Sequence, residues 1–365
     1  MILFSSVIQT FEVEFLKHYQ DSMLPSHRKA LTAMKDCRTT QSPVMLAQCE
    51  ACDSQSFIPH SCGHRNCPHC QQHESQQWLE RQLKKQVPAE YFLLTFTLPE
   101  EMRPLAWQHQ RTLYSLMIRC GWETVKTFTQ NDRQLQGNAG AISVLHTHSR
   151  RLDYHPHVHM VMPAAAIDAK QRLWRTKKSK GKNQAGYLFN HKVLAKVFRA
   201  KLLEAIQQEG VELPARYPEA WVVDVKSVGS GDKALVYLGR YLYKGVIQEK
   251  DIIACRDGQV TFRYQDSKTR QMLTRTLPGA QFLWLILRHV LPKGFRRTRN
   301  FGFLHPNSKR LLGLLQYLLG INPNQALAWL KKRPPLKCPC CGEVMKIVRT
   351  RILSPFSFGF SMSTG

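Results

Sequence analysis

Apolar and polar residues recur along the chain with two periods, which predict both helices and strands. Helical spacing is accompanied by start or stop signals such as Pro25 with Ser26, Gly210 and Pro292. We expect helices at 25–38, 76–86, 111–130, 191–210, 231–246 and 280–292. Short β-branched and aromatic runs predict strands at 91–99, 221–228, 258–266 and 271–278, and two more within 140–165.

This order of elements predicts an α+β fold with a largely antiparallel sheet, because strands that pair as hairpins alternate with crossover helices. Residues 37–73 do not follow the pattern, since they have little apolar periodicity and need something other than a hydrophobic core to hold them. Residues 172–186 are expected to form a basic loop.

The charge of the chain is strongly positive and spread along its length. There are 52 Lys and Arg against 26 Asp and Glu, a net charge of +26 over 365 residues, which favours a polyanionic partner such as nucleic acid. No run approaches the roughly 18 apolar residues of a membrane span. Glu12 and Glu14 interrupt the apolar start, which is not a good signal peptide. We expect a cytoplasmic protein with no membrane partner.

Two cysteine pairs, Cys49-x-x-Cys52 and Cys67-x-x-Cys70, have the spacing of metal-binding knuckles. Two such pairs complete a tetrahedron, so we predict a structural Zn²⁺, with Cys62 as a further candidate ligand. Four thiolates leave no open position for catalysis, and the ion would replace the core that this segment lacks. Nearby histidines could also be ligands, so the sequence does not decide which four residues bind the ion or whether a second ion binds: His60, His64, His69 and His73.

Three more cysteines lie near the C-terminus, at Cys338, Cys340 and Cys341. Cys338 and Cys341 form one knuckle, but no second knuckle follows. This pair either borrows ligands from elsewhere in the chain or binds no metal firmly. Cys120 and Cys255 stand alone and are expected to be ordinary buried thiols.

Histidines alternate in "YHPHVHM" at 154–160. Alternate residues of a strand share a face, so His157 and His159 can bind one divalent ion through neutral imidazoles. Pro156 is expected to leave His155 outside the regular strand. The alternative is a set of half-buried, hydrogen-bonded histidines.

The preceding strand carries His146 and His148, also in alternation. If the two strands pair around a turn near Leu152, His146 lies opposite His159 and His148 opposite His157. Either could complete the metal site.

A predicted helix contains two tyrosines, Tyr237 and Tyr241, spaced by four residues and therefore on one face. Arg240 and Lys244 add positive charge beside them. They could be amphipathic residues at a domain edge. Next to a metal site in a basic protein they could instead be nucleophiles, because a phenolate can attack a phosphate and conserve the bond energy as phosphotyrosine.

The chain resembles the transposases of the insertion sequence 91 family, which belong to the superfamily of endonucleases named for a His-hydrophobe-His (HUH) motif. One departure is the crowded element at 338–341. The resemblance extends over nearly the whole chain and rests on these motifs, in order: "CRT" (37–39), "SCGHRNCPHC" (61–70), Trp78, "FTLP" (96–99), "HTHSRRLDYHPHVH" (146–159), "YLGRY" (237–241) and "HVLPKGFRRTRNFG" (289–302).

This resemblance implies cleavage and joining of single-stranded DNA by rolling-circle-type transposition. It implies that His157 and His159 bind Mg²⁺ or Mn²⁺, with His146 as the third ligand. It also implies that Tyr237 and Tyr241 form 5′-phosphotyrosine intermediates, one holding a first end while the other attacks a second junction.

The implied fold is an HUH endonuclease-like central antiparallel sheet flanked by helices, with the histidine strand at its centre and the tyrosine helix beside it. A small zinc-binding domain precedes it. We divide the chain accordingly: an N-terminal helical segment (1–36), the zinc-binding domain (37–88), the HUH two-tyrosine nuclease domain (89–270), a basic C-terminal region with a cysteine knuckle (271–350) and a disordered tail (351–365).

The expected partners are single-stranded DNA at the transposon ends and at the target, and a host helicase or the replication machinery, because the chain has no Gly-x-x-x-x-Gly-Lys phosphate loop of its own. Trp174, Phe295 and Phe301 could stack on bases or pack in the core. The candidate DNA contacts are Arg240, Lys244, Lys177, Lys178, Lys180, Arg296, Arg297 and Arg299.

Three other functions compete with this interpretation. A rolling-circle replication initiator would use the same chemistry. A non-catalytic zinc-containing DNA-binding regulator explains the charge and the cysteines but leaves the histidines and tyrosines without a role. A cut-and-paste transposase would need an acidic triad, which no motif marks.

Overall fold

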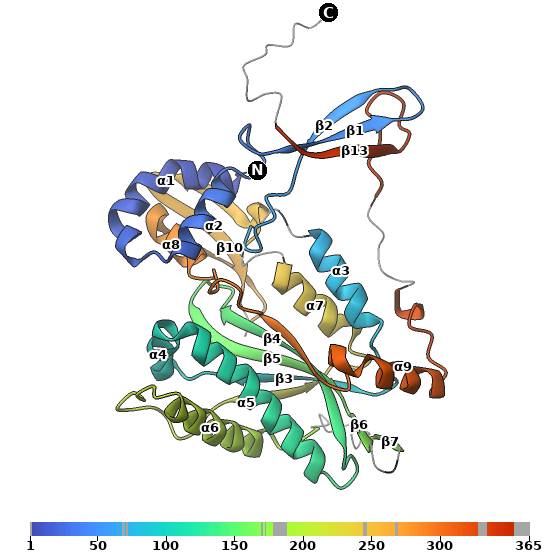
Figure 1. Cartoon of the computed structure of the whole chain (residues 1–365). Helices are drawn as coiled ribbons and strands as arrows, with labels where there is room; N and C mark the ends of the chain where they lie inside the picture. Colours follow the sequence, from blue (N-terminus) through green and yellow to red (C-terminus); the bar gives the residue numbers. More distant parts are fainter. Residues whose placement is uncertain are drawn as a thin grey trace, which may run out of the picture. The chain divides into compact units, whose positions relative to one another are not determined.

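The computed structural model describes residues 2–67, 70, 72–168, 171, 173–177, 188–243, 247–266, 269–327 and 334–353. The chain forms two compact units, each assembled from segments that are distant in the sequence (Figure 1). The first unit contains Met1–Glu74, Tyr243–Val290 and Trp329–Gly365, and the second contains Ser75–Leu242 and Leu291–Ala328.

The second unit is built on a seven-stranded sheet, as far as the structure describes the chain. The strand order is β7-β6-β4-β5-β3-β8, with β12 paired to β4, and every pairing between these described strands is antiparallel. The long strands β4 and β5 therefore lie inside the sheet. The strands are β3 (Tyr91–Thr97), β4 (Asn138–His148), β5 (Tyr154–Pro163), β6 (Ala165–Asp168), β7 (Leu173–Thr176), β8 (Val223–Ser227) and β12 (Thr298–Gly302).

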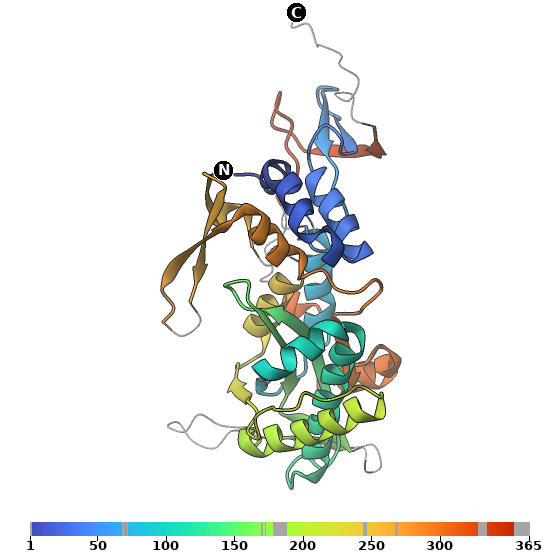
Figure 2. The same ribbon diagram turned by 90° about the vertical axis from the view of Figure 1, so that its left-hand side faces the viewer.

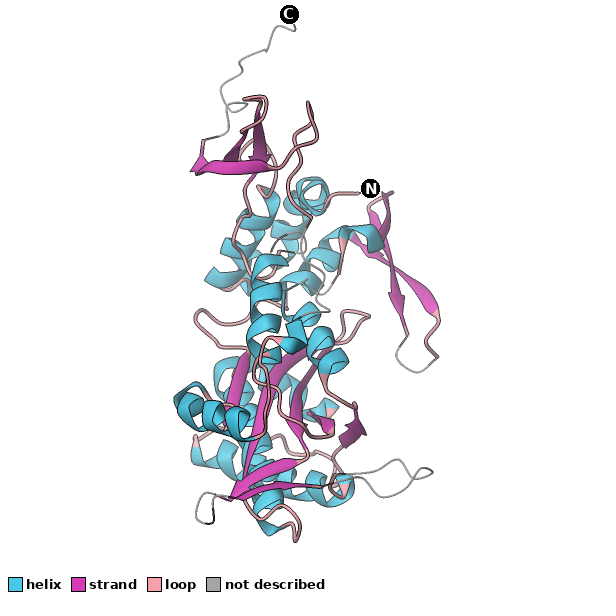
Figure 3. Ribbon diagram, turned by 90° about the vertical axis from the view of Figure 1, so that its right-hand side faces the viewer, coloured by secondary structure: helices cyan, strands magenta, loops and turns pink. Residues whose placement is uncertain are grey.

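One face of this sheet carries the hydrophobic core of the unit. Alternate residues of β3 and β5, among them Phe96 and Val158, pack against α5 (Gln110–Asn131) and α6 (His191–Gln208). The rings of Phe96 and Phe198 lie 4.9 Å apart. Figure 3 shows these strands between helices. Because successive side chains of a strand point to opposite faces, the residues between the core positions of β5 face the other side of the sheet.

Two further helices, α3 (Gln72–Leu83) and α7 (Asp232–Tyr243), pack closely against each other. The hydroxyl of Ser75 donates to the carbonyl oxygen of Gly239 at 3.1 Å. A Cβ atom at Gly239 would lie 3.3 Å from the ring of Trp78, so the glycine permits this close approach. The remaining helices of the unit are α4 (Arg103–Gln108) and α9 (Lys309–Leu318).

In its described residues, the first unit combines three α-helices with two small antiparallel sheets. Phe15 is fully buried, and Tyr19 stacks on Trp284 with ring centroids 5.1 Å apart. Figure 2 shows the β10–β11 hairpin extending away from the helices of this unit. The elements are α1 (Phe4–Tyr19), α2 (Pro25–Lys35), α8 (Gly279–Leu287), the sheet β9 (Ile252–Arg256), β10 (Gln259–Gln265), β11 (Met272–Pro278), and the sheet β1 (Val44–Cys49), β2 (Gln55–Pro59), β13 (Met345–Ile352).

The structure confirms the predicted α+β class and the central antiparallel sheet, and it corrects several details. The strand β5 begins at Tyr154, so His155 and Pro156 lie within it. Part of the predicted basic loop, Leu173–Thr176, forms β7. The expected disordered tail lies outside the described residues from 354 onward. Among the described helices, none is long and apolar enough to cross a membrane.

Candidate active site and metal-binding sites

Three histidines from two neighbouring strands form one cluster in the second unit. His146 lies on β4, and His157 and His159 lie on β5. The nearest ring nitrogens of all three lie within 4.8 Å of one another. The predicted register is wrong by two residues, because His146 pairs with His157 rather than with His159. The cluster still forms, since both histidines of β5 share the face that His146 occupies.

The surroundings of these rings favour the neutral imidazole. Burial lowers the pKa of His157 to about 4 and the pKa values of His146 and His159 well below their ordinary range. For His146, the other two imidazoles and then Arg297 lower the pKa further. Neutral imidazole is the form that binds metal, so the donor set fits a single divalent ion.

Hydrogen bonds hold two of the three rings. Nδ1 of His157 donates to the carbonyl oxygen of His155 at 2.7 Å, which leaves Nε2 with a lone pair for an ion. Nδ1 of His159 lies 3.0 Å from the hydroxyl of Thr95 on the neighbouring strand. The ring orientations are therefore set by the protein before any ion binds.

The other two candidate histidines lie outside the cluster. A register shift between His146 and His148 places His148 opposite Tyr154, where it packs against the tyrosine ring and its Nδ1 lies 3.0 Å from the hydroxyl of Thr147. Nδ1 of His155 accepts from Arg103 at 2.9 Å. The geometry therefore brings His146, and not His148, to the pair on β5.

The helix α7 places a tyrosine beside the histidines. The ring of Tyr237 lies 6.3 Å from that of His146 and 6.2 Å from that of His159, centroid to centroid, and 40% of the residue is exposed. A phenol in this position is open to a substrate and close to the cluster. Tyr241 follows four residues later on the backbone of α7. The side chains of Arg240 and Tyr241, and all of Lys244, lie outside the described residues.

Eight cysteines of the first unit form two clusters of four, and the predicted tetrad is not one of them. Cys67 and Cys70 lie with two earlier cysteines, Cys37 and Cys62. The Sγ–Sγ distances are 3.5 Å for Cys37–Cys70, 3.6 Å for Cys37–Cys67 and 3.7 Å for Cys62–Cys70. A tetrahedron with Zn–S bonds of about 2.3 Å has edges of about 3.8 Å, so these thiols fit a structural Zn²⁺.

The second cluster contains Cys49, Cys52, Cys338 and Cys341. Cys49 and Cys341 are separated by 3.5 Å between sulfur atoms, and Cys52 and Cys338 by 3.6 Å. The backbone N–H of Cys341, followed by that of Cys340, lowers the pKa of Cys338 to about 6 and so favours its thiolate. The C-terminal knuckle thus takes its partners from the N-terminal part of the chain.

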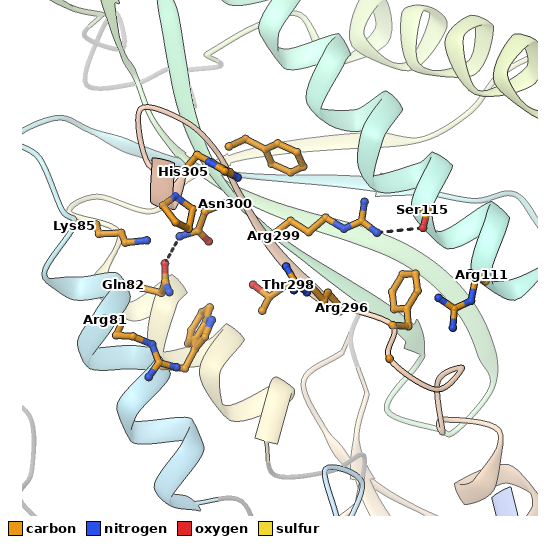
Figure 4. Close-up of a pocket in the computed structure, with 15 residues that line it drawn as sticks. Arg81, Gln82, Lys85, Arg111, Ser115, Arg296, Thr298, Arg299, Asn300 and His305 are labelled. Atoms are coloured by element: carbon orange, nitrogen blue, oxygen red, sulfur yellow. Dashed lines mark hydrogen bonds between the residues drawn. The ribbon is translucent and has the colours of Figure 1, made fainter. Parts of the chain in front are cut away.

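A basic cavity of about 730 Å³ lies in the second unit, between α3, the start of α5 and the segment 294–306 (Figure 4). No carboxylate is among the described residues that line it. Arg299 donates to the hydroxyl of Ser115 at 3.1 Å, and Asn300 donates to Gln82 at 2.9 Å. The cationic residues of the lining are Arg81, Lys85, Arg111, Arg296 and Arg299. Such a cavity favours an anionic ligand.

Other candidate DNA contacts have different surroundings. The carbonyl oxygen of Arg297 accepts from the backbone N–H of Leu145 at 2.9 Å, next to His146. Lys177 is paired with Asp132 at 2.5 Å. Lys178 and Lys180 lie outside the described residues. The three candidate stacking rings contact other rings instead: Trp174 meets Phe303, Phe295 meets Tyr114, and Phe301 stacks on Trp122.

Comparison with known proteins gives the identity of the chain. A family model described as "Putative transposase" matches residues 140–311, and one described as "Transposase zinc-binding domain" matches residues 7–98. The curated "Putative transposase y4qJ" of Sinorhizobium fredii is 31% identical over 360 residues, covering 88% of each chain. The chain belongs to the insertion sequence 91 family of transposases. Its predicted function as a transposase is confirmed, and it is an enzyme that cuts and transfers DNA strands.

Other proteins are more distantly similar to this transposase. The transposase for insertion sequence element IS801 of Pseudomonas savastanoi pv. phaseolicola is 27% identical, over 87% of this chain and 82% of the other. Solved structures of the conjugative relaxase TrwC with oriT DNA, metal-free and metal-bound, are 16% identical. They cover 63% and 64% of this chain and 72% and 73% of theirs, with TM-scores of 0.26 and 0.27. At these scores the structural similarity supports no conclusion.

Sequence reasoning missed some residues of the transposase's sites. Cys37 is the first cysteine of the "CRT" motif, and its position among clustered thiols was the signal that it could be a ligand. Arg81, Lys85 and Arg111 lie on predicted helices, where single basic residues are ordinary. Only the fold brings them to one cavity, so no local signal could have identified them.

Proposed function

We propose that this transposase nicks and rejoins single-stranded DNA with Tyr237 and Tyr241 as nucleophiles, beside a divalent ion held by His146, His157 and His159. The observation that carries the proposal is the position of the Tyr237 ring, 6.2 and 6.3 Å from two rings of the histidine cluster. A phosphate that reaches this phenol is therefore also within reach of a metal-binding site.

In the first step, the phenolic oxygen of Tyr237 or Tyr241 attacks the phosphorus of the scissile phosphodiester. The bond from phosphorus to the 3′ oxygen breaks, and that oxygen leaves as a 3′ hydroxyl after taking up a proton. The DNA 5′ end is then a phosphotyrosine, which conserves the energy of the broken bond. A bound Mg²⁺ or Mn²⁺ would polarise the phosphate and balance the developing negative charge.

Rejoining reverses these bonds. A 3′ hydroxyl attacks the phosphotyrosine, the bond between phosphorus and the tyrosine oxygen breaks, and the phenol is regenerated. Two tyrosines suit transposition, because one can hold the first end while the other attacks a second junction. Tyr237 and Tyr241 are one helical turn apart on α7, which allows both to act at a single histidine site.

The single strand would be held by the basic cavity described above. Its cations include Arg296, which precedes β12, and Arg299, which lies on β12, and β12 pairs with the histidine strand β4. The DNA backbone would therefore run beside the strand that carries His146. Phosphate contacts of this kind give affinity with little sequence preference. A host helicase or the replication machinery as a further partner stays a prediction.

The experiment is a test for a covalent adduct. Purified protein is incubated with labelled single-stranded oligonucleotides that cover the element's ends, with Mg²⁺ or Mn²⁺, and resolved on a denaturing gel. We expect an ion-dependent protein–DNA band that is lost in Tyr237→Phe/Tyr241→Phe and in His157→Ala/His159→Ala. The single tyrosine variants then show which residue attacks first.

Two matched variants serve as controls. His155→Ala removes a histidine of the same strand that lies outside the cluster, and Tyr217→Phe removes a phenol of the same unit. Both are expected to keep the adduct. Tight binding of the correct ends by the wild-type protein without any adduct would refute the proposal and support the non-catalytic regulator.

A further inference from the structure

The cluster of Cys49, Cys52, Cys338 and Cys341 joins two distant parts of the sequence. Cys49 is the last residue of β1 and Cys52 follows it, whereas Cys338 and Cys341 precede β13. The family's zinc-binding model covers residues 7–98 and therefore contains only the first two of these four thiols. The range of the family model therefore does not contain this four-thiol cluster as a whole.

The backbone around this cluster is a small sheet of three strands. The order is β13-β1-β2, so the C-terminal strand pairs antiparallel with β1, and Cys49 is aligned with Met345. One cysteine knuckle lies at the turn between β1 and β2, and the other lies shortly before β13. An ion pair between Lys346 and Glu50, at 2.5 Å, adds a surface contact between these two parts of the sequence.

Very little apolar packing supports this sheet. Its described hydrophobic cluster consists of Ala47, Cys49, Cys338 and Met345, with Ile58 packed against it. Most of β13 is exposed, including Ile347 at 51% and Val348 at 50%. A core this small does not stabilise a module by itself, and natural modules of this size use disulfides or a structural metal.

The geometry of the thiols favours the metal. The sulfur atoms are 3.5 and 3.6 Å apart in the two cross-knuckle pairs, close to the edge of about 3.8 Å expected for tetrahedral Zn–S₄. The backbone N–H of Cys340 also points at Sγ of Cys338, at 3.4 Å, a contact that suits a metal-bound thiolate. Cys340 itself is exposed and takes no part in the cluster.

We propose that Cys49, Cys52, Cys338 and Cys341 bind a second structural Zn²⁺, which fastens the segment 334–353 to β1. The chain then carries two zinc ions with different tasks. The Cys37, Cys62, Cys67 and Cys70 site lies wholly within the N-terminal region. The second site closes a module from both ends of the described chain. This inference is independent of the proposed DNA chemistry.

The first measurement is the metal content of the full-length protein, purified with a tag that binds no metal and analysed by mass spectrometry for zinc and iron. We expect two zinc ions per wild-type chain, two in Cys340→Ser, and one in Cys338→Ser/Cys341→Ser. Cys340→Ser is the matched control, because it removes a thiol from the same four-residue element without touching the cluster.

The second measurement is hydrogen exchange of peptides from β13 and from α1. In Cys338→Ser/Cys341→Ser, β13 is expected to lose protection while α1 keeps it, which also shows that the rest of the variant is folded. One zinc per wild-type chain, two zinc ions retained in the double variant, or iron in place of zinc would each overturn the proposal. The number of zinc ions per wild-type chain tests the proposal even if the double variant does not fold.

Discussion

The basic cavity of the second unit makes a quantitative prediction about DNA binding. Five cationic side chains line it, and no carboxylate is among the described lining residues. Each phosphate contacted in a single strand contributes about 0.7 to the slope of log affinity against log salt concentration. If Arg296 and Arg299 contact one phosphate each, Arg296→Gln/Arg299→Gln lowers this slope by about 1.4. Between 50 and 200 mM salt, the variant's affinity then falls about sevenfold less than that of the wild type.

Fluorescence anisotropy of a labelled single-stranded oligonucleotide, titrated at several NaCl concentrations, measures both slopes. The matched control is Arg133→Gln/Arg216→Gln, which removes the same charge from two exposed arginines of this unit that do not line the cavity. Thermal unfolding checks that the loss of the Arg299–Ser115 hydrogen bond has not unfolded the unit. Equal changes of slope in the two double variants would mean that net charge, and not the cavity, attracts the DNA.

Three further predictions concern the elements around the site. Both Gly302 and Gly294 have positive φ, but a Cβ at Gly302 would clash with a carbonyl oxygen of β4, whereas a Cβ at Gly294 would meet open space. Gly294→Ala should lower the free energy of unfolding by about 1 kcal/mol, or Tm by roughly 2–4 °C, and Gly302→Ala should lower both by more than twice as much. Similar shifts of Tm in calorimetry would contradict the packing. Gly239→Ala should lower Tm and adduct yield together by pressing on Trp78, 3.3 Å away, and an unchanged yield would show that the helix tolerates displacement. Thr95→Val removes a hydrogen bond to a histidine of the cluster and should weaken Mn²⁺ binding about 10- to 100-fold by calorimetric titration, with unchanged affinity as the contrary result.

Local patterns were sufficient for most of the fold and for placing two of the candidate histidines on one face of a strand. The alternation in "YHPHVHM" places His157 and His159 on one face whatever the partner strand is, because the period of a strand is two. Val158, between them, enters the core against α5 and α6. A pattern that depends only on neighbouring residues can be read without knowledge of the tertiary structure.

The pairing of strands was not predictable to the residue. A turn near Leu152 was expected and is present, with φ of +72° at that residue. The irregularity between His146 and His148 then shifts the register, and no simple alternation reveals such a bulge. Only the structure shows that His146, rather than His148, lies beside His157 and His159.

The prediction of which cysteines cluster together was wrong for a different reason. Cys49-x-x-Cys52 and Cys67-x-x-Cys70 are close in sequence, and short loops make their association the simplest expectation. Strand β13, almost 300 residues later in the sequence, pairs with β1 and so places the knuckle of Cys338 and Cys341 next to Cys49 and Cys52. Spacing alone carries no information about such a distant partner.

The pairing of β13 with β1 also has a consequence for how the protein is made. On the ribosome, β1 ends at Cys49, and its neighbour β2 begins at Gln55, but its other neighbour β13 does not begin until Met345, roughly 300 residues later. At about 5–20 residues per second, β1 would wait roughly 15 to 60 s for that neighbour. The third strand of the small sheet can therefore pair only after residues 345–352 have been made. A transposase product that terminates before Cys338 would keep its histidines and tyrosines but would leave Cys49 and Cys52 without the two thiols of the C-terminal knuckle.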